Sequence, residues 1–64
     1  MATSERTDGP TPNGGSYAIA YWRDDRGRPV EREQATMVEV VEYDERGNQV
    51  ASTVALLGRP ERPL

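Results

Sequence analysis

The side chains follow a period of two along three segments of this chain. In the first segment, residues 16–23 (SYAIAYWR), tyrosine and isoleucine at odd positions alternate with alanine and tryptophan at even positions. Residues 36–43 (TMVEVVEY) and 49–57 (QVASTVALL) continue the pattern with valine, alanine and leucine. A period of two is typical of β-strands, because successive side chains of a strand point to opposite faces. The sequence therefore predicts strands over these three segments.

The predicted strands carry apolar side chains on both of their faces. In the second strand, Val38 and Val40 share one face, whereas Met37, Val41 and Tyr43 share the other. A sheet in one layer buries a face only where a second layer packs on it. The two-sided pattern therefore indicates contacts between copies of the chain.

An internal repeat supplies the connections between strands. Residues 23–30 (RDDRGRPV) and 43–50 (YDERGNQV) share aspartate, arginine, glycine and valine at equivalent positions. Aspartate at the start of a turn accepts a hydrogen bond from the backbone two residues on, and glycine three residues later adopts the left-handed conformation that closes a hairpin with a bulge. We therefore predict two hairpins, whose turns contain Asp24 with Gly27 and Asp44 with Gly47.

The segment before the second strand has no turn residue, and three structures fit it. Residues 30–35 (VEREQA) could form a short charged strand that bends into the next one, or residues 28–43 could form one long strand. A helix over residues 29–46 also fits, because proline favours the first helical position and Gly47 would follow the last one. The β-branched and aromatic residues of this segment favour the strand readings.

These elements predict an all-β protein, a small antiparallel meander of three or four strands with disordered termini. Residues 1–15 contain no large apolar residue after Met1 and are predicted to form a disordered N-terminal tail. Residues 58–64 (GRPERPL) contain two prolines, which prevent regular strand pairing, and are predicted to form an extended tail. The single β domain is expected over residues 16–57.

The second copy of the repeat has a counterpart among known proteins. Residues 43–48 (YDERGN) resemble the tyrosine–aspartate repeat of large secreted β-shell proteins. The first copy has Arg23 in the place of the tyrosine. Because the likeness is confined to one turn, we carry no function over from that family.

The apolar residues are few for a monomer. Between Tyr17 and Leu57 the chain has fourteen large apolar or aromatic side chains, and it has no cysteine to form a disulfide. Chains this short bury a small share of their surface. We therefore expect a homo-oligomer, most simply a dimer, together with contacts to an unidentified protein partner. The predicted interface residues are Tyr17, Tyr21, Trp22, Tyr43, Val54 and Leu56.

Two residue types that often carry catalysis, histidine and cysteine, are missing. The chain has no histidine and no cysteine, and all eight of its basic residues are arginine. The serines and threonines therefore have no histidine to activate them. The acidic pairs Asp24-Asp25 and Asp44-Glu45 lie in the predicted turns and lack the further ligands that a calcium loop needs. We predict no catalytic, cofactor-binding or metal-binding residue, and no enzyme.

A nucleic-acid-binding sheet is the alternative. Aromatic and basic side chains gather in the first predicted hairpin, and such sets stack bases and hold phosphates. The set consists of Tyr17, Tyr21, Trp22, Arg23, Arg28 and Arg32. Phosphate binding is driven by excess positive charge, whereas the chain has a net charge of −3. We therefore expect single-stranded DNA or RNA to bind less readily than protein.

Neither a membrane span nor a signal peptide is predicted. Residues 49–58 contain neither charge nor proline, but this stretch is well short of the ~18 apolar residues that a spanning helix needs. The first residues have no apolar segment of the kind a signal peptide contains. We expect a cytoplasmic, non-catalytic interaction module that acts through protein–protein contacts and self-association.

Overall fold

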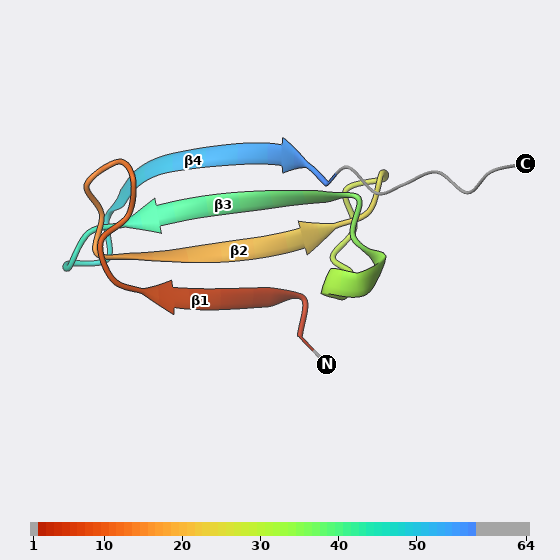
Figure 1. The fold of residues 1–64 in the computed structure, drawn as a ribbon, viewed down its shortest axis with the longest axis horizontal. Coiled ribbons are helices and arrows are strands. Elements are labelled where there is room, and N and C mark those ends of the chain that lie inside the picture. The colour runs from red at the N-terminus through yellow and green to blue at the C-terminus, as the bar shows by residue number, and fades with distance from the viewer. Residues whose placement is uncertain (1, 58–64) are drawn as a thin grey trace, which may run out of the picture.

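The protein is a single open β-sheet. The structure is a computed structural model, and it describes residues 2–57 of the chain. Its four strands are antiparallel and lie in the order β1-β2-β3-β4 (Figure 1). The strands are β1 (Ser4–Asp8), β2 (Tyr17–Arg23), β3 (Met37–Tyr43) and β4 (Gln49–Leu56). The predicted all-β meander is confirmed, and it has four strands. The tail predicted over residues 58–64 lies outside the described residues.

Strand β1 corrects the prediction for residues 1–15. Residues 4–8 pair with β2 from Ser4 opposite Tyr21 to Asp8 opposite Tyr17, so this part of the chain is not a disordered tail. Every residue of β1 is exposed. An edge strand that is wet on both faces needs no apolar residues, because backbone pairing with β2 holds it. The prediction of disorder was wrong because it rested on the absence of large apolar residues, which this strand does not need.

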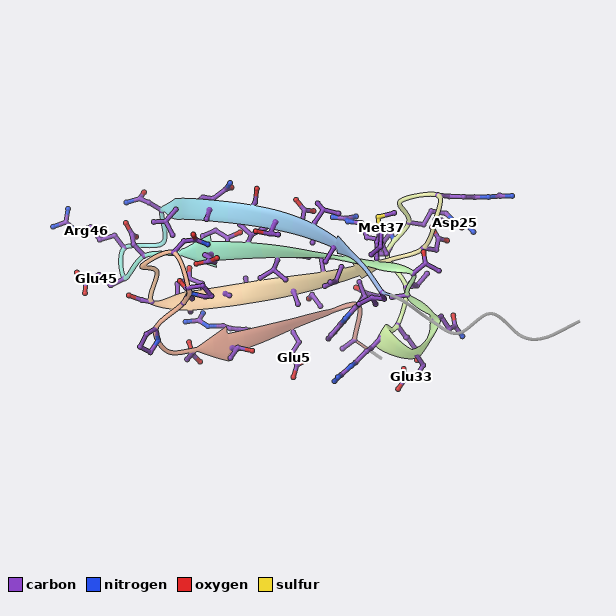
Figure 2. The ribbon with its side chains drawn as sticks, turned by 45° about the horizontal axis from the view of Figure 1, so that its top comes forward. Glu5, Asp25, Glu33, Met37, Glu45 and Arg46 are labelled. Carbon is purple, nitrogen blue, oxygen red and sulfur yellow. The ribbon has the colours of Figure 1, made fainter. Side chains whose placement is uncertain are left out.

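The strand register sorts the side chains onto two faces. Opposed residues of neighbouring strands lie on the same face, and alternate residues of one strand lie on opposite faces. The tyrosine face is the one that carries Tyr17, Ile19, Tyr21 and Arg23 of β2, Met37, Glu39, Val41 and Tyr43 of β3, Ser52, Val54 and Leu56 of β4, and Ser4, Arg6 and Asp8 of β1. The tryptophan face carries Ala18, Ala20 and Trp22, with Val38, Val40 and Glu42, Ala51, Thr53 and Ala55, and Glu5 and Thr7. In Figure 2, the labelled side chains of Met37 and Glu5 point to opposite faces of the sheet.

Both predicted turns are present, and they share one geometry. In each turn the aspartate carbonyl accepts a hydrogen bond of 3.0 Å from the glycine N–H, Gly27 to Asp24 and Gly47 to Asp44. The two glycines have φ angles of 79° and 85°, in the left-handed region. The second turn joins β3 directly to β4, with a register shift next to Tyr43. This turn therefore closes a complete hairpin.

The first turn closes a much shorter hairpin than the second turn does. After it, the chain pairs with β2 only at an isolated bridge between Arg23 and Pro29, next to a hydrogen bond from the Val30 N–H to the Trp22 carbonyl. The backbone N–H of Trp22 donates to the Thr3 carbonyl, so the edge of β2 that Val30 contacts is the edge that faces β1. The chain must then pass around the end of β2 to reach β3. The first hairpin is therefore a short fold-back, and β3 pairs with β2 only after a longer connection.

That connection contains a short 3₁₀ helix, η1 (Arg32–Gln34). The long-strand reading and the helix reading of this segment are both wrong, because β3 begins at Met37 and runs to Tyr43. The strand–bend–strand reading is the nearest, with the bridge at Pro29 in place of a strand and η1 as the bend. Within the described residues, no α-helix occurs.

Burial in this sheet is shallow. Among the described residues, the buried hydrophobic side chains are Trp22, Ala35 and Val41. The remaining residues of β2 and most of β3 are half-buried, and all of β4 except Ala51 is exposed. The sheet therefore has no second layer to make a conventional core from these residues.

Candidate interaction surface

Aromatic side chains pack side by side on the tyrosine face. The rings of Tyr17 and Tyr43 are stacked, with centroids 5.1 Å apart and planes inclined by 17°. The Arg6 guanidinium carbon lies 4.0 Å from the centroid of the Tyr17 ring, at cation–π distance. Arg6 also forms a 2.9 Å ion pair with Asp8. Three strands, β1 to β3, therefore contribute to one aromatic and cationic row.

A second arginine covers the next tyrosine along β2. Arg23 lies 5.9 Å from the Tyr21 ring centroid and forms a 3.3 Å ion pair with Glu39 of β3. A hydrogen bond with the Tyr21 side chain raises the pKa of Tyr43, and partial burial acts in the same direction. Tyr43 therefore interacts with both of the other tyrosines of this face, through its ring with Tyr17 and through its side chain with Tyr21.

The tyrosine face ends in exposed apolar side chains on β4. Leu56 is 79% exposed and Val54 is 61% exposed. Five of the six predicted interface residues lie on this face, since Tyr17, Tyr21 and Tyr43 share it with Val54 and Leu56. The structure therefore brings most of the predicted interface together along one continuous surface.

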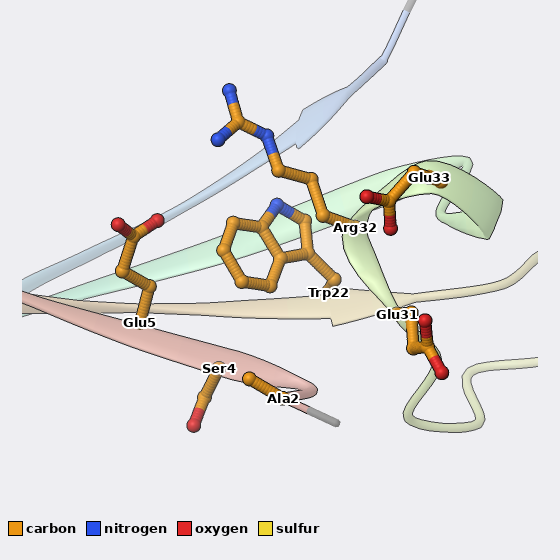
Figure 3. Close-up of a pocket in the computed structure, with 7 residues that line it drawn as sticks. All are labelled: Ala2, Ser4, Glu5, Trp22, Glu31, Arg32 and Glu33. Carbon is orange, nitrogen blue, oxygen red and sulfur yellow. The ribbon is translucent and has the colours of Figure 1, made fainter.

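Trp22, the sixth predicted interface residue, lies on the opposite face. It faces a hollow of about 370 Å³ near the start of β1 (Figure 3). The Arg32 guanidinium carbon lies 5.8 Å from the centroid of the indole ring, so an arginine of the chain itself contacts the ring. The hollow is lined by Ala2, Ser4, Glu5, Trp22, Glu31, Arg32 and Glu33. Trp22 therefore packs beside η1 and is separated from the tyrosines.

The other end of the tryptophan face is covered by the β1–β2 loop. Glu42 is 4% exposed, and its two carboxylate oxygens accept hydrogen bonds from the Asn13 backbone N–H at 3.0 Å and from Asn13 Nδ2 at 2.6 Å. A hydrogen bond from Thr11, together with those from Asn13, holds the pKa of Glu42 below its ordinary value. Gly15 lies against the Tyr43 carbonyl, where an added Cβ would come within 2.8 Å of the oxygen. The loop is therefore fastened to β3 by a buried carboxylate.

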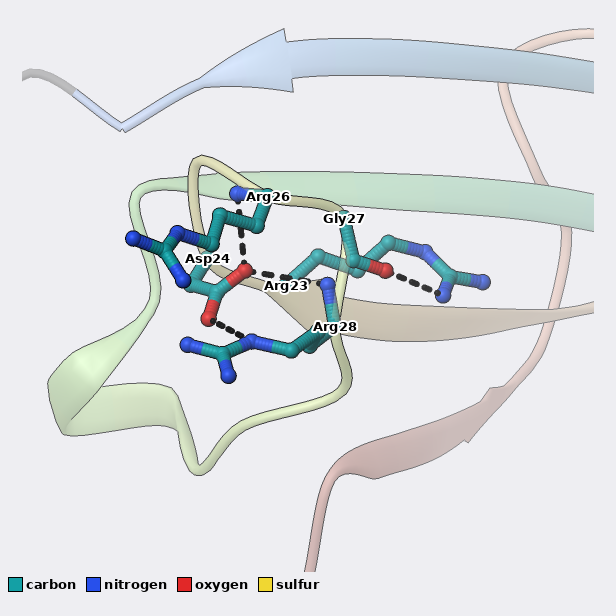
Figure 4. Close-up of polar contacts among 5 residues, drawn as sticks. All are labelled: Arg23, Asp24, Arg26, Gly27 and Arg28. Carbon is teal, nitrogen blue, oxygen red and sulfur yellow. Dashed lines mark hydrogen bonds and ion pairs between the residues drawn. The ribbon is translucent and has the colours of Figure 1, made fainter.

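The first aspartate of each acidic pair, Asp24 or Asp44, binds the backbone of its own turn. Asp24 Oδ1 accepts hydrogen bonds from the backbone N–H groups of Arg26 and Arg28, each 2.9 Å long, and Oδ2 pairs with Arg28 Nε at 2.9 Å (Figure 4). Asp44 repeats the backbone pattern with Arg46 and Asn48. In both turns, the backbone N–H four residues on is the main cause of a lowered carboxyl pKa.

These carboxylates stabilise turns, and they do not converge on a common point. Over residues 2–57, the structure has no group of three or more acidic, histidine or cysteine side chains arranged to hold a metal ion. Both oxygens of Asp24 are already engaged with Arg26 and Arg28. The turn geometry thus accounts for Asp24 and Asp44.

The aromatic and basic residues named for the nucleic-acid alternative do not form one cluster. Its aromatic set is divided, with Tyr17 and Tyr21 on one face and Trp22 on the other. Arg23 and Arg28 are both ion-paired with carboxylates, to Glu39 and Asp24 respectively. Bases need open ring faces to stack on, and phosphates need positive charge that is not already neutralised.

Two residues that contact these faces were not identified from the sequence, Arg6 on the tyrosine face and Asn13 on the tryptophan face. Arg6 lies in the segment expected to be disordered, and Asn13 lies in the loop that follows it. The dipeptides Asp8-Gly9 and Asn13-Gly14 were an available signal, because such pairs mark turns that connect strands. The pairing of Asn13 with Glu42, 29 residues away, has no local signal.

Comparison with protein-family models, curated proteins and solved structures finds no match to this chain. Among the described residues, no helix is long and apolar enough to cross a membrane. The fold and the surface themselves are therefore the basis for a functional proposal.

Proposed function

We propose that this protein is a small non-catalytic interaction module, which acts through protein–protein contacts that include contacts between its own copies. The observation that carries the proposal is the tyrosine face, which ends in exposed Val54 and Leu56. The β1–β2 loop contacts Glu42, and η1 contacts Trp22, so both irregular segments pack on the tryptophan face. Apolar surface left in water is a common mark of a protein-binding surface.

The composition of this surface supports the same proposal. Tyrosine, arginine and exposed aliphatic residues are common where binding energy concentrates in protein interfaces. On the tyrosine face, Tyr17 and Tyr43 are held rigidly by stacking, so a partner that binds them loses little side-chain freedom. A partner or a second copy would therefore meet a preformed surface.

Sedimentation equilibrium over a wide range of concentrations tests the self-association. We expect the average mass to rise above the 7.1 kDa of one chain as the concentration increases. The melting temperature is expected to rise in parallel, because association stabilises the folded chain by mass action. A folded species of 7.1 kDa whose melting temperature does not depend on concentration would contradict the proposal.

The nucleic-acid alternative is tested by titration with single-stranded DNA and RNA at low salt. Binding that weakens steeply as salt increases would favour it, because counterion release governs such complexes. We expect no such binding, since Arg23 and Arg28 are already paired with carboxylates.

A further inference from the structure

The free edge of β4 has a defined set of unpaired backbone groups. The Leu57 N–H donates to the Thr36 carbonyl at 2.9 Å, so the backbone of Leu57 faces β3. In an antiparallel pair, the backbone groups of alternate residues face the same neighbour. The unbroken register from Ala51 to Leu56 therefore turns the N–H and C=O groups of Ser52, Val54 and Leu56 away from the sheet.

The two edges of the sheet differ in length and charge. The β1 edge has five residues, SERTD, and three of them are charged. The β4 edge has eight residues, QVASTVAL, with no charge and no proline. Charges and short length protect an edge from pairing with another chain, whereas a long uncharged edge invites it. Of the two edges, β4 is the one open to pairing.

We propose that the β4 edge is the self-association surface and that its occupant is the β4 strand of a second copy, paired antiparallel so that two sheets become one. This inference rests on the proposed function and specifies the surface that performs it. The uncharged edge favours a second copy, because a two-fold axis brings identical segments together and no like charges meet along β4. A β1 edge on a two-fold axis would instead bring charged residues together.

The extent of the uncharged strand sets the register. Full overlap of residues 49–57, which are β4 and the adjoining Leu57, with the same residues of a second copy places the two-fold axis at Thr53, the middle residue. Thr53 faces β3 with its backbone, so the two threonines would form a non-hydrogen-bonded pair, in which Cα atoms lie about 4.5 Å apart. Ser52 and Val54 would form the flanking hydrogen-bonded pairs. The tyrosine faces of both copies would then continue across the join.

A cysteine substitution tests this register directly, because the natural chain has no cysteine. We expect Thr53→Cys to form an intermolecular disulfide under mild oxidation, since the expected Cα separation lies within the range that disulfides span. The matched control is Val40→Cys, which lies opposite Thr53 on the same face but one strand further in. Two copies of β3 would lie about three strand spacings apart in the joined sheet, roughly 14 Å, which is too far for a disulfide.

A proline substitution tests the edge without removing a bond within the sheet. Val54→Pro deletes an N–H that points away from β3, and edge strands tolerate proline there. We expect this variant to keep its β-sheet circular dichroism and to sediment at 7.1 kDa, while the natural chain sediments at twice that mass. The matched control is Ser4→Pro, whose N–H points outward from the β1 edge, and which we expect to remain a dimer.

The outcomes separate this inference from the proposed function. If Val54→Pro still dimerises, or if Val40→Cys crosslinks as readily as Thr53→Cys, the β4 edge is not the surface, although self-association itself stands. Crosslinking through Val40→Cys would indicate stacking of tryptophan faces. If the natural chain is a folded monomer at all concentrations, the proposed self-association fails as well.

Discussion

The rings of Tyr17 and Tyr43 stack across β2 and β3 at a centroid distance of 5.1 Å, although 26 positions separate them in the chain. Tyr17 begins β2 and Tyr43 ends β3, and the two residues are directly opposite each other, so the contact lies at one end of the strand pair. Arg6 from β1 lies against the Tyr17 ring. In a sheet without a second layer, such rows of neighbouring side chains replace part of the missing core.

Replacing Tyr17 tests this row. We expect Tyr17→Leu to lower the free energy of unfolding by about 1 kcal/mol, because a stacked aromatic pair contributes ~0.5–1.5 kcal/mol beyond the area it buries. Urea denaturation followed by circular dichroism measures the change. The control is Tyr17→Phe, which keeps the ring and should lose little. Equal stability of the Leu and Phe variants would show that stacking contributes nothing.

The turn glycines give a second prediction. Gly27→Val and Gly47→Val are each expected to destabilise the protein by roughly 1–2 kcal/mol, the cost of a left-handed backbone in a residue with a Cβ. Both glycines have φ angles near 80°, at 79° and 85°. Asparagine tolerates this conformation better, so Gly27→Asn is the matched control and should lose less. Valine variants as stable as the natural chain would contradict the turn assignment.

The turn aspartates predict a dependence of stability on pH. Backbone hydrogen bonds lower the pKa of Asp44 below its ordinary value of 3.8 in the folded protein. The unfolded chain therefore binds the proton more tightly, so this contribution to stability is complete above the ordinary pKa and is lost as the pH falls through the lowered one. We expect the melting temperature to decrease when the pH falls below about 4.

Asp44→Asn isolates this effect. Asparagine keeps an oxygen that can accept from the Arg46 and Asn48 N–H groups, but it does not titrate. We expect the variant to fold at pH 7 and to lose less stability than the natural chain between pH 5 and pH 2. Asp24→Asn should behave in the same way. Melting curves that fall equally with pH in all three proteins would exclude the aspartates as the cause.

Glu42 gives a fourth prediction, which concerns the β1–β2 loop. Glu42→Leu removes both acceptors of Asn13 while an apolar side chain of similar size fills the space. We expect the Asn13 amide to exchange with solvent faster, while amides of β2 and β3 stay protected, as measured by hydrogen exchange and NMR. The control is Glu39→Gln on the opposite face, which should leave Asn13 unchanged. Unchanged protection of Asn13 in Glu42→Leu would mean that other contacts hold the loop.

Much of the fold could be predicted from residues that are close in the chain. The alternation in β2, β3 and β4 and the Asp–Gly spacing of the turns depend on neighbours a few positions away, and the structure has these strands and turns. The two faces of β2 follow from the same alternation. That alternation already places Trp22 on the face opposite Tyr17 and Tyr21, so the predicted interface residues of β2 do not share one face.

Strand β1 and the η1 connection could not be predicted in this way. The residues of β1 are polar and exposed on both faces, and what makes them a strand is pairing with β2 across the Gly9–Ser16 loop. The charged sequence around η1, taken alone, is compatible with a strand, a bend or a helix. Pairing of Pro29 and Val30 on the β1 side of β2 obliges the chain to cross to the other side, and η1 makes that crossing.

The sequence by itself determined the strand alternation, the turn chemistry, and the lack of histidine and cysteine, because each depends on residue type and on near neighbours. Tertiary structure alone decided which strands form the edges, that Glu42 anchors the loop through Asn13, and that Tyr17 meets Tyr43. These features depend on register between segments distant in the chain. Register is a property of the paired strands together, and no single segment encodes it.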